Sequence, residues 1–170
     1  MEINSLDFVF KHSVNRVMQP NQHIFEMYSE DKSKKLGTLV CHKSELPLRP
    51  NYDGSVLAID FLLVNDRNKG TGTKILKFAE DLSRQMGCKG YMTLKADGSY
   101  TPNSVPHIFY RKFGFSAFDK KTDKKFDKFI RQNRQATWRD FPNLLMHYPP
   151  APQKHSFFKE MFCNLFKFLR

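Results

Sequence analysis

Two glycines in a short basic stretch are the first chemical signal in the chain. The stretch reads Arg-Asn-Lys-Gly-Thr-Gly over residues 67–72, between an apolar run and a helical pattern. A strand, a glycine turn and a helix N-terminus in succession present bare backbone N–H groups that suit a phosphate. Gly70 and Gly72 allow positive φ angles and close approach of a ligand, and Arg67 and Lys69 add positive charge. The stretch predicts an anion-binding turn, although it matches neither common glycine fingerprint for nucleotides.

A carboxylate in the preceding apolar run is a candidate for acid–base chemistry. Asp60 is the single ionisable residue of residues 56–64, and strand alternation places it on one face with Val56, Ala58 and Leu62. Two interpretations stay open. Asp60 either acts as a base or orients a substrate, or it accepts structural hydrogen bonds from neighbouring donors.

A tyrosine in a second helical segment is a candidate proton donor. Asn103 opens this segment, Tyr110 follows two helical turns later, and Gly114 and Phe115 close it. A phenol has a reference pKa of ~10, so Tyr110 carries its proton at neutral pH. The alternative is that Tyr110 is an aromatic residue of the core.

In this order, the two motifs resemble those of the GNAT superfamily of acetyl-CoA-dependent N-acyltransferases. The pyrophosphate loop of that family reads R/Q-x-x-G-x-G/A, and its later helix typically reads N-x-x-x-x-x-x-Y-x-x-x-G-F. The resemblance covers residues 56–118. It implies an enzyme that moves an acetyl group from acetyl-CoA to an amine, by direct attack of the amine on the thioester.

The resemblance also implies a fold of the α/β (α+β) class. The expected sheet is mixed and mostly antiparallel, and helices flank it. Its central parallel pair, residues 56–64 and 90–94, is expected to splay apart at the cofactor site.

Particular residues are implied to meet the cofactor and the reacting groups. Loop amides hold the pyrophosphate, the end of the strand pairs with the pantetheine, and Tyr110 lies beside the thioester sulphur. In the family, a base often occupies positions that match Val56 or Ala58. Since neither residue here accepts a proton, Asp60 is the remaining candidate. The expected contacts with acetyl-CoA are Leu62, Leu63, Val64, Arg67, Asn68, Lys69, Gly70, Thr71, Gly72, Thr73, Asn103 and Tyr110.

Hydrophobic periodicity predicts the elements around these motifs. Strands are expected at residues 6–10, 23–28, 36–41, 115–118 and 144–148, and helices at 71–86, within 103–113 and within 119–138. The family usually has two helices after its first strand, but residues 11–22 leave room for one short helix around 13–18. The wall of the acceptor pocket must then come from the 44–55 loop, with Tyr52 and Asp53, or from the basic insertion that contains Trp138.

The chain divides into a GNAT-like domain at residues 1–148, a proline-rich linker at 149–153 and an amphipathic helix at 154–170. That helix has one strongly apolar face. It is expected to pack on the domain or in a homodimer, with contact to an anionic membrane as the alternative.

The charge balance favours polyanionic partners. Lys and Arg number 28 against 17 Asp and Glu, a net charge of +11. Such a field attracts phosphorylated cofactors, RNA or acidic membranes. The amine acceptor is therefore either a small molecule or a group attached to protein or RNA. The alternative function is a non-catalytic module that binds CoA, RNA or a membrane.

The cysteines and histidines indicate no metal site. Three cysteines, widely spaced, form no zinc pattern and no disulfide framework, and the histidines have no ligand spacing. No secretion signal is recognised at the N-terminus, so we expect a cytoplasmic protein.

Overall fold

The computed structural model describes residues 2–5, 8–15, 21–45, 54–65, 69–99, 105–134, 136–137 and 139–148. The predicted linker and amphipathic helix lie outside the described residues, as do Tyr52, Asp53 and Trp138. Within the described part of the chain, no helix is long and apolar enough to cross a membrane.

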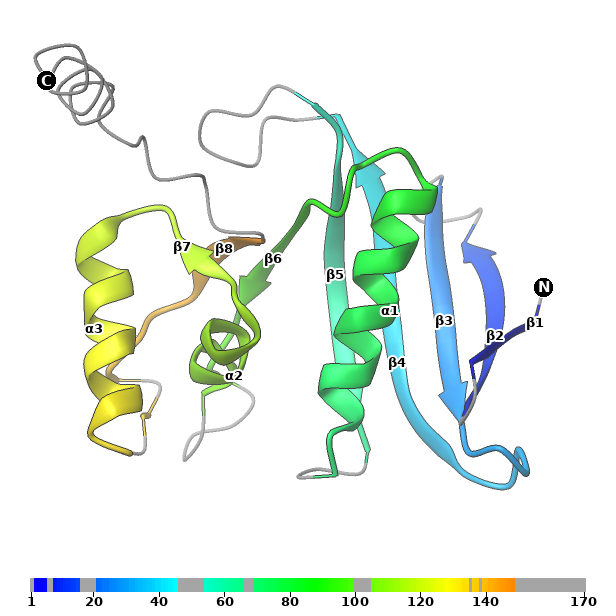
Figure 1. Ribbon diagram of the computed structural model, residues 1–170, viewed down its shortest axis with the longest axis horizontal. Helices are drawn as coiled ribbons and strands as arrows, with labels where there is room; N and C mark the ends of the chain where they lie inside the picture. Colours follow the sequence, from blue (N-terminus) through cyan, green and yellow to red (C-terminus); the bar gives the residue numbers. More distant parts are fainter. Residues whose placement is uncertain are drawn as a thin grey trace, which may run out of the picture.

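Eight strands form one sheet, and a single pair of them is parallel (Figure 1). Their order across the sheet is β1-β2-β3-β4-β5-β6-β8-β7. The parallel pair is β5–β6, and the other pairs are antiparallel. This arrangement confirms the expected mixed, mostly antiparallel sheet. The strands are β1 (Glu2–Ser5), β2 (Phe8–Asn15), β3 (Gln22–Tyr28), β4 (Lys35–Ser44), β5 (Val56–Val64), β6 (Met92–Ala96), β7 (Ser116–Ala117) and β8 (Leu144–Tyr148).

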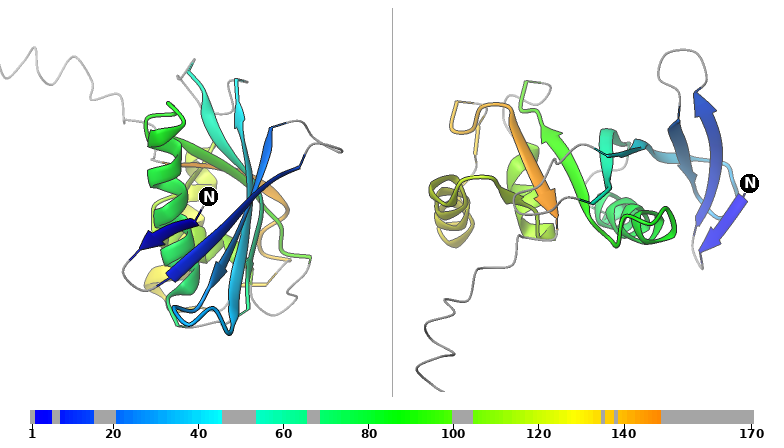
Figure 2. Two further views of the ribbon diagram at one scale, coloured as in Figure 1. Left: turned by 90° about the vertical axis from the view of Figure 1, so that its right-hand side faces the viewer. Right: turned by 90° about the horizontal axis from the view of Figure 1, so that it is seen from above.

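Three helices lie on one side of this sheet, which we call the helix face (Figure 2). They are α1 (Thr71–Gln85), α2 (Pro106–Phe113) and α3 (Lys120–Arg131). No described helix covers the opposite side, which we call the open face. Helix α1 buries Ile75, Leu76 and Ala79 against β4 and β5, as its 3.6-residue apolar spacing predicts.

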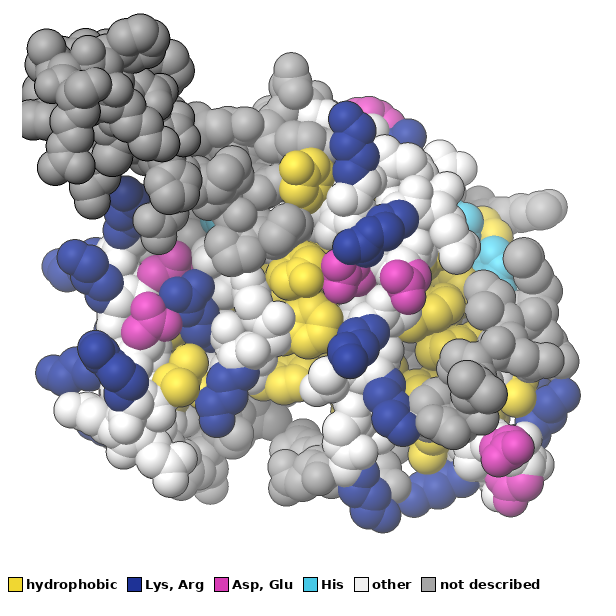
Figure 3. All heavy atoms as spheres, viewed as in Figure 1, with side chains coloured by type: hydrophobic (Ala, Val, Ile, Leu, Met, Phe, Trp, Pro, Cys, Tyr) yellow, Lys and Arg dark blue, Asp and Glu magenta, His cyan; other side chains and the backbone are white. Residues whose placement is uncertain are grey.

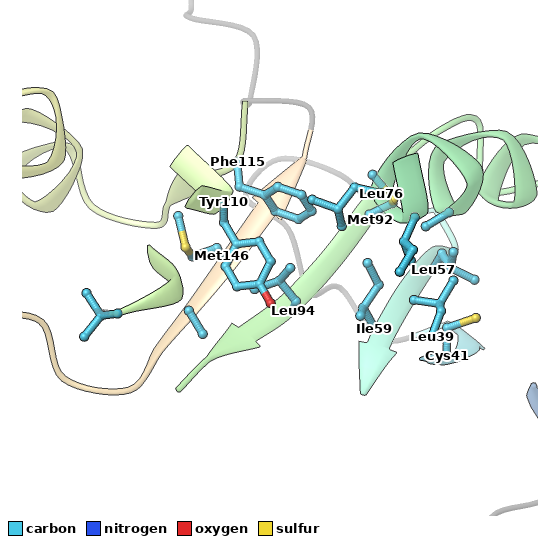
Figure 4. Close-up of a cluster of buried hydrophobic side chains, with 14 of the residues drawn as sticks. Leu39, Cys41, Leu57, Ile59, Leu76, Met92, Leu94, Tyr110, Phe115 and Met146 are labelled. Atoms are coloured by element: carbon cyan, nitrogen blue, oxygen red, sulfur yellow. The ribbon is translucent and has the colours of Figure 1, made fainter. Parts of the chain in front are cut away.

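The core fills the space between the helices and the helix face of the sheet (Figure 4). Leu39 and Leu57 project from neighbouring strands toward α1, and both are fully buried. Met92 and Phe115 continue the same layer toward α2 and β8. This layer fixes the relative positions of α1, α2 and the parallel strand pair.

The N-terminal part of the sheet differs from the sequence prediction. Strand β1 was not expected, and β2 continues to Asn15, paired with Gln22 of β3. The short helix expected around residues 13–18 is therefore wrong for residues 13–15, and residues 16–18 lie outside the described part. The pairing between β2 and β3 runs without interruption from Val9–Tyr28 to Asn15–Gln22.

Candidate functional site

The two parallel strands separate partway along their length. They pair at Leu57–Met92, Ala58–Thr93 and Ile59–Leu94. Beyond that point β5 continues against β4, while β6 continues against β8. Figure 4 shows the two strands diverging toward their C-terminal ends. The expected splayed opening is therefore present, and residues 60–64 of β5 border it.

A β-bulge lies at the start of this opening. Val40 pairs with Phe61 and Cys41 pairs with Ile59, so Asp60 has no partner on β4. An extra residue in one strand reverses the alternation that follows. Leu62 consequently opposes Leu39 on the helix face, and the predicted shared face of Asp60 and Leu62 is wrong.

The bulge also changes the burial of β5. Residues 56–59 are buried, as expected for a central strand, but Asp60, Phe61 and Leu63 are exposed. Phe61 is 49% exposed and Leu63 is 42% exposed, because the open face has no described helix above it. The prediction of a strand buried on both faces holds for the first half of β5 only.

The carboxylate of Asp60 accepts two hydrogen bonds on the open face. Nδ1 of His42, on β4, lies 2.9 Å from Oδ2 of Asp60. Nε2 of Gln22, on β3, donates to the same oxygen at 2.9 Å. His42 lies directly opposite Ala58 in the β4–β5 register. No sequence pattern indicates a role for His42, because Asp60 lies 18 residues away and only the strand register brings the two together.

Tyr110 lies on the other side of the same opening. The tyrosine comes from α2 on the helix face, where its ring packs edge-on to Phe115 at a centroid distance of 5.8 Å. Its hydroxyl lies beside Leu94, at the last paired position of the two parallel strands (Figure 4). Tyr110 is 8% exposed, and burial raises its pKa to about 12. The hydroxyl therefore keeps its proton throughout the neutral range.

The glycine turn opens α1 as the sequence predicted. Gly70 is the N-cap residue, with φ of 75° in the left-handed region. No described side chain caps the helix, and its first turn contains no acidic residue. The first intrahelical bond runs from Lys74 N to Gly70 O at 3.0 Å. The N–H groups of residues 71–73 precede that bond and make up the positive end of the helix dipole.

Gly72 has a packing role that the sequence did not reveal. It lies inside α1 and does not have a positive φ. A Cβ atom at this position would lie 2.9 Å from Cζ of Phe109 and 3.5 Å from a methyl carbon of Val64. Since Phe109 precedes Tyr110 on α2, this close contact brings the two sequence motifs together in space.

Part of the predicted site lies outside the described residues, namely Arg67, Asn68 and Asn103. The other predicted contacts are described. Leu62, Leu63 and Val64 border the opening, and Lys69, Gly70, Thr71, Gly72 and Thr73 surround the start of α1.

Two other reactive groups are buried and structural. Burial raises the pKa of the Cys41 thiol to about 12, and the negative charge of Asp60 adds to the shift. His107 is fully buried, and its Nε2 donates to the carbonyl oxygen of Pro142 at 2.9 Å. Among the described residues, no group of His, Cys, Asp and Glu side chains could hold a metal ion.

The opening between the parallel strands, the glycine turn at α1 and Tyr110 on α2 have the arrangement that the family resemblance implied. This topology agrees with the GNAT-type fold that the sequence resemblance implied.

Several solved structures are similar to this chain. No protein-family model matches the chain, and no curated protein sequence matches it. A structure described as a bacterial toxin aligns with a TM-score of 0.47 and 14% identity, over 74% of this chain and 66% of that chain. A histone acetyltransferase HPA2 and related acetyltransferase from Corynebacterium glutamicum aligns with a TM-score of 0.43 and 14% identity, over 78% and 67%.

A third similar structure is a mutant of the AtaT toxin, bound to the C-terminus of the antitoxin AtaR and to acetyl-CoA. It aligns with a TM-score of 0.41 and 13% identity, over 65% of this chain and 73% of that chain. The present chain spans slightly less than two thirds of the bacterial toxin, and 62% of a similar protein from Pyrococcus horikoshii. At these identities the likeness concerns the fold alone.

Proposed function

We propose that this protein transfers an acetyl group from acetyl-CoA to an amine. One observation carries the proposal. The opening between β5 and β6 has Tyr110 on its helix face, and the hydrogen-bonded pair of His42 and Asp60 on its open face. A thioester seated in the opening would have a hydrogen-bond donor on one side and a proton acceptor on the other.

The pyrophosphate of acetyl-CoA is assigned to the start of α1. Amides of residues 71–73 and the helix dipole favour an anion there. Gly70 supports this assignment, because a Cβ atom at that position would meet no atom of the described residues within 4 Å. The surface beside the turn is therefore open to a ligand. Arg67 and Lys69 would add charge, and Asn103 would contact the arm of the cofactor, as the family resemblance implies.

The pantetheine arm is assigned to the exposed edge of β5. Residues 61–64 pair with β4 but not with β6, so one side of this strand faces the opening. Leu62, Leu63 and Val64 would bond to the arm through their backbone groups. A backbone amide at this edge would also polarise the thioester carbonyl as negative charge develops on its oxygen.

The acetyl transfer then follows from these positions. The neutral amine nitrogen attacks the thioester carbonyl carbon, and the new C–N bond forms as a tetrahedral intermediate. The C–S bond then breaks, and the proton lost from the nitrogen must be accepted. Holding the amine and the thioester together supplies much of the rate in any reaction of this kind.

His42 is the proton acceptor that the described geometry supports best. The resemblance implied a base at the position of Ala58, and His42 lies directly across from that residue on β4. Facing residues of antiparallel strands have Cβ atoms about 5 Å apart. The imidazole of His42 therefore lies close to where a basic side chain at position 58 would lie. Oδ2 of Asp60 accepts a hydrogen bond from Nδ1–H of His42 and so fixes the tautomer, which leaves Nε2 to accept a proton from the amine.

Tyr110 is assigned a hydrogen bond to the departing sulphur. Its pKa of about 12 lies well above the reference value of ~8.5 for a thiol. Full transfer of the phenolic proton to the thiolate would therefore be uphill. Donation of a hydrogen bond requires no such transfer, and it stabilises the negative charge on the sulphur as the C–S bond breaks.

Calorimetric titration of the full-length protein with acetyl-CoA tests the donor assignment. We expect a saturable heat at micromolar to millimolar cofactor, and no binding at ~1 mM would overturn the proposal. Thiol release with a panel of amines then tests turnover. Binding without amine-dependent thiol release would support the alternative function, a CoA-binding module without catalysis.

A further inference from the structure

A second charged surface lies away from the splayed strands, on the outward side of α3. This helix connects β7 to β8, and its inward side is apolar. Phe126 and Phe129 are buried against Phe141. The carboxylate of Asp119 accepts a hydrogen bond from Thr122 N at 2.8 Å and caps the N-terminus. These contacts hold α3 against the domain, and they thereby set the positions of the residues on its outward side.

Both acidic residues within α3, Asp123 and Asp127, pair with Arg111 of α2. Arg111 of α2 donates to the two carboxylate oxygens of Asp127 at 3.0 and 3.1 Å. Asp123 lies 3.5 Å from the same guanidinium, and it accepts a hydrogen bond from Ala117 N at 2.8 Å. Arg111, which lies outside the helix, offsets one of these two negative charges.

Two basic side chains, one in α3 and one just after it, lie over aromatic rings. The ammonium of Lys125 lies 4.6 Å from the ring centre of Phe141, and Lys125 also donates to the carbonyl oxygen of Asp140. The guanidinium of Arg134 lies 4.8 Å from the ring centre of Phe129. These contacts of Lys125 and Arg134 stabilise the attachment of the helix.

Four other cations form a row on the outward side. Lys121, Lys124, Lys128 and Arg131 are all exposed and follow one helical stripe at spacings of three, four and three residues. None of the four forms an ion pair with another described residue. Figure 3 shows basic side chains gathered where α3 faces the viewer. Neighbouring like charges repel, so the row is unfavourable until an anion lies against it.

We propose that this row of α3 binds the phosphodiester backbone of a nucleic acid. Ten residues of α-helix span ~15 Å, the length over which one strand of a duplex carries about four phosphates. A shallow depression lies along the row and is lined by Lys124, Asp127, Ile130 and Arg131. We assign one strand of the nucleic acid to this depression. The proposal stands on α3 alone and does not depend on acetyl transfer.

A membrane surface fits this helix less well than a nucleic acid. A helix that lies on a bilayer inserts an apolar face into it. The large apolar side chains of α3, Phe126 and Phe129, instead point into the domain. The one apolar residue that lines the depression on the outward side is Ile130, and a single half-buried side chain does not form an apolar face.

Fluorescence anisotropy of full-length protein with a labelled 20-nucleotide RNA, a DNA duplex of the same sequence and phosphatidylserine vesicles tests the proposal. The test variant changes Lys121, Lys124, Lys128 and Arg131 to Gln. The control variant removes the same charge elsewhere, at the exposed residues Lys32, Lys77, Lys89 and Lys95. The ratio of RNA to DNA affinity identifies which backbone is preferred.

We expect wild-type binding to weaken with salt at a logarithmic slope of about −3, as for about four phosphate contacts. The α3 variant should lose more than about tenfold in affinity at 50 mM salt, with a slope near zero, while the control loses about threefold or less. Equal losses in both variants, an unchanged α3 variant, or binding to vesicles alone would overturn the proposal.

A second measurement keeps the test decisive if the α3 variant does not fold. RNA or DNA should protect Lys121, Lys124 and Lys128 of the wild-type protein from chemical acylation, as read by mass spectrometry. Lys77 and Lys89 should react at unchanged rates. Absence of protection on α3 would contradict the assignment.

Discussion

Nδ1 of His42 and Oδ2 of Asp60 lie 2.9 Å apart, across neighbouring strands and beside the point where β5 leaves β6. The carboxylate also accepts a hydrogen bond from Gln22. A carboxylate that fixes one nitrogen of an imidazole leaves the other nitrogen to act as a base. This pair distinguishes the proposed acetyl transfer from simple cofactor binding, because binding acetyl-CoA requires no base.

Replacement of His42 tests that distinction. We expect His42→Gln to lower kcat/KM by about 100-fold, within the range for a placed base, and to leave acetyl-CoA affinity unchanged. Stability should change by less than ~1 kcal/mol, since the side chain is half-exposed. Steady-state kinetics and calorimetry measure the two effects separately.

The double variant with Asp60→Asn supplies the internal control. Residues that act as a unit give non-additive losses, so the double variant should be no slower than His42→Gln alone. His12→Gln removes another half-buried histidine that is not bonded to Asp60, and it should retain full activity. Multiplicative losses at His42 and Asp60 would show that the two act separately.

Tyr110→Phe tests the hydrogen bond to the departing sulphur. The ring packing against Phe115 is retained, so we expect stability and acetyl-CoA affinity close to those of the wild type. Turnover should fall by roughly 10- to 100-fold, as for loss of a donor to developing charge. Tyr148→Phe removes a hydroxyl that bonds to Glu80 at 3.3 Å, and it should not affect turnover. A loss of affinity without loss of kcat would assign Tyr110 to cofactor binding.

The sequence predicted the elements whose signals are local. The helix expected at residues 71–86 is α1, because its apolar spacing, its opening glycine turn and Gly87 lie within one continuous stretch. Strand β8 was predicted with its observed bounds, 144–148. Each of these signals depends on residues close together in the chain.

The site depends on relationships that sequence patterns do not contain. The prediction that side chains alternate between the two faces assumes a regular strand. The bulge at Asp60 could not be predicted in this way, and Leu62 was therefore assigned to the wrong face. The pairing of His42 with Asp60 depends on the β4–β5 register. Gly72 was interpreted as a phosphate-binding glycine, and the sequence did not reveal that its missing side chain also makes room for the ring of Phe109 on another helix.

The buried imidazole of His107 predicts a loss of stability in mild acid. Burial lowers its pKa below the ordinary value of 6.5, so the folded protein resists protonation. Below pH 6.5 the unfolded chain gains a proton that the folded chain does not, and stability falls as the pH decreases. Above pH 6.5, His107 makes no contribution to the pH dependence of stability. Below the pKa of His107 in the folded protein, both states carry the proton and stability falls no further on this account.

Urea unfolding between pH 7.5 and 5 measures this contribution. A single such group contributes at most ~1.4 kcal/mol per pH unit. His107→Gln can still donate to the carbonyl of Pro142 but does not titrate, so its stability should depend less on pH. His12, whose pKa burial also lowers, accounts for part of the remaining slope. Identical slopes for wild type and His107→Gln would contradict the prediction.

The contact between Gly72 and Phe109 predicts a specific coupling between the two sequence motifs. In most helices Gly→Ala is stabilising by up to ~1 kcal/mol. Here the added methyl group would lie 2.9 Å from a ring carbon of Phe109, and overpacking of this kind costs ~1–3 kcal/mol. We therefore expect Gly72→Ala to destabilise the protein by about 1 kcal/mol.

A double-mutant cycle identifies the cause of that loss. Phe109→Leu shortens the side chain that meets the new methyl group, so it should restore part of the stability lost in Gly72→Ala. Gly87 provides the matched control, since its φ is 80° and no atom of the described part of the chain lies within 4 Å of an added Cβ. Gly87→Ala should be destabilising through backbone strain alone, and Phe109→Leu should not relieve it. Additive effects at Gly72 and Phe109, within ~0.5 kcal/mol, would show that the glycine is not required for this contact.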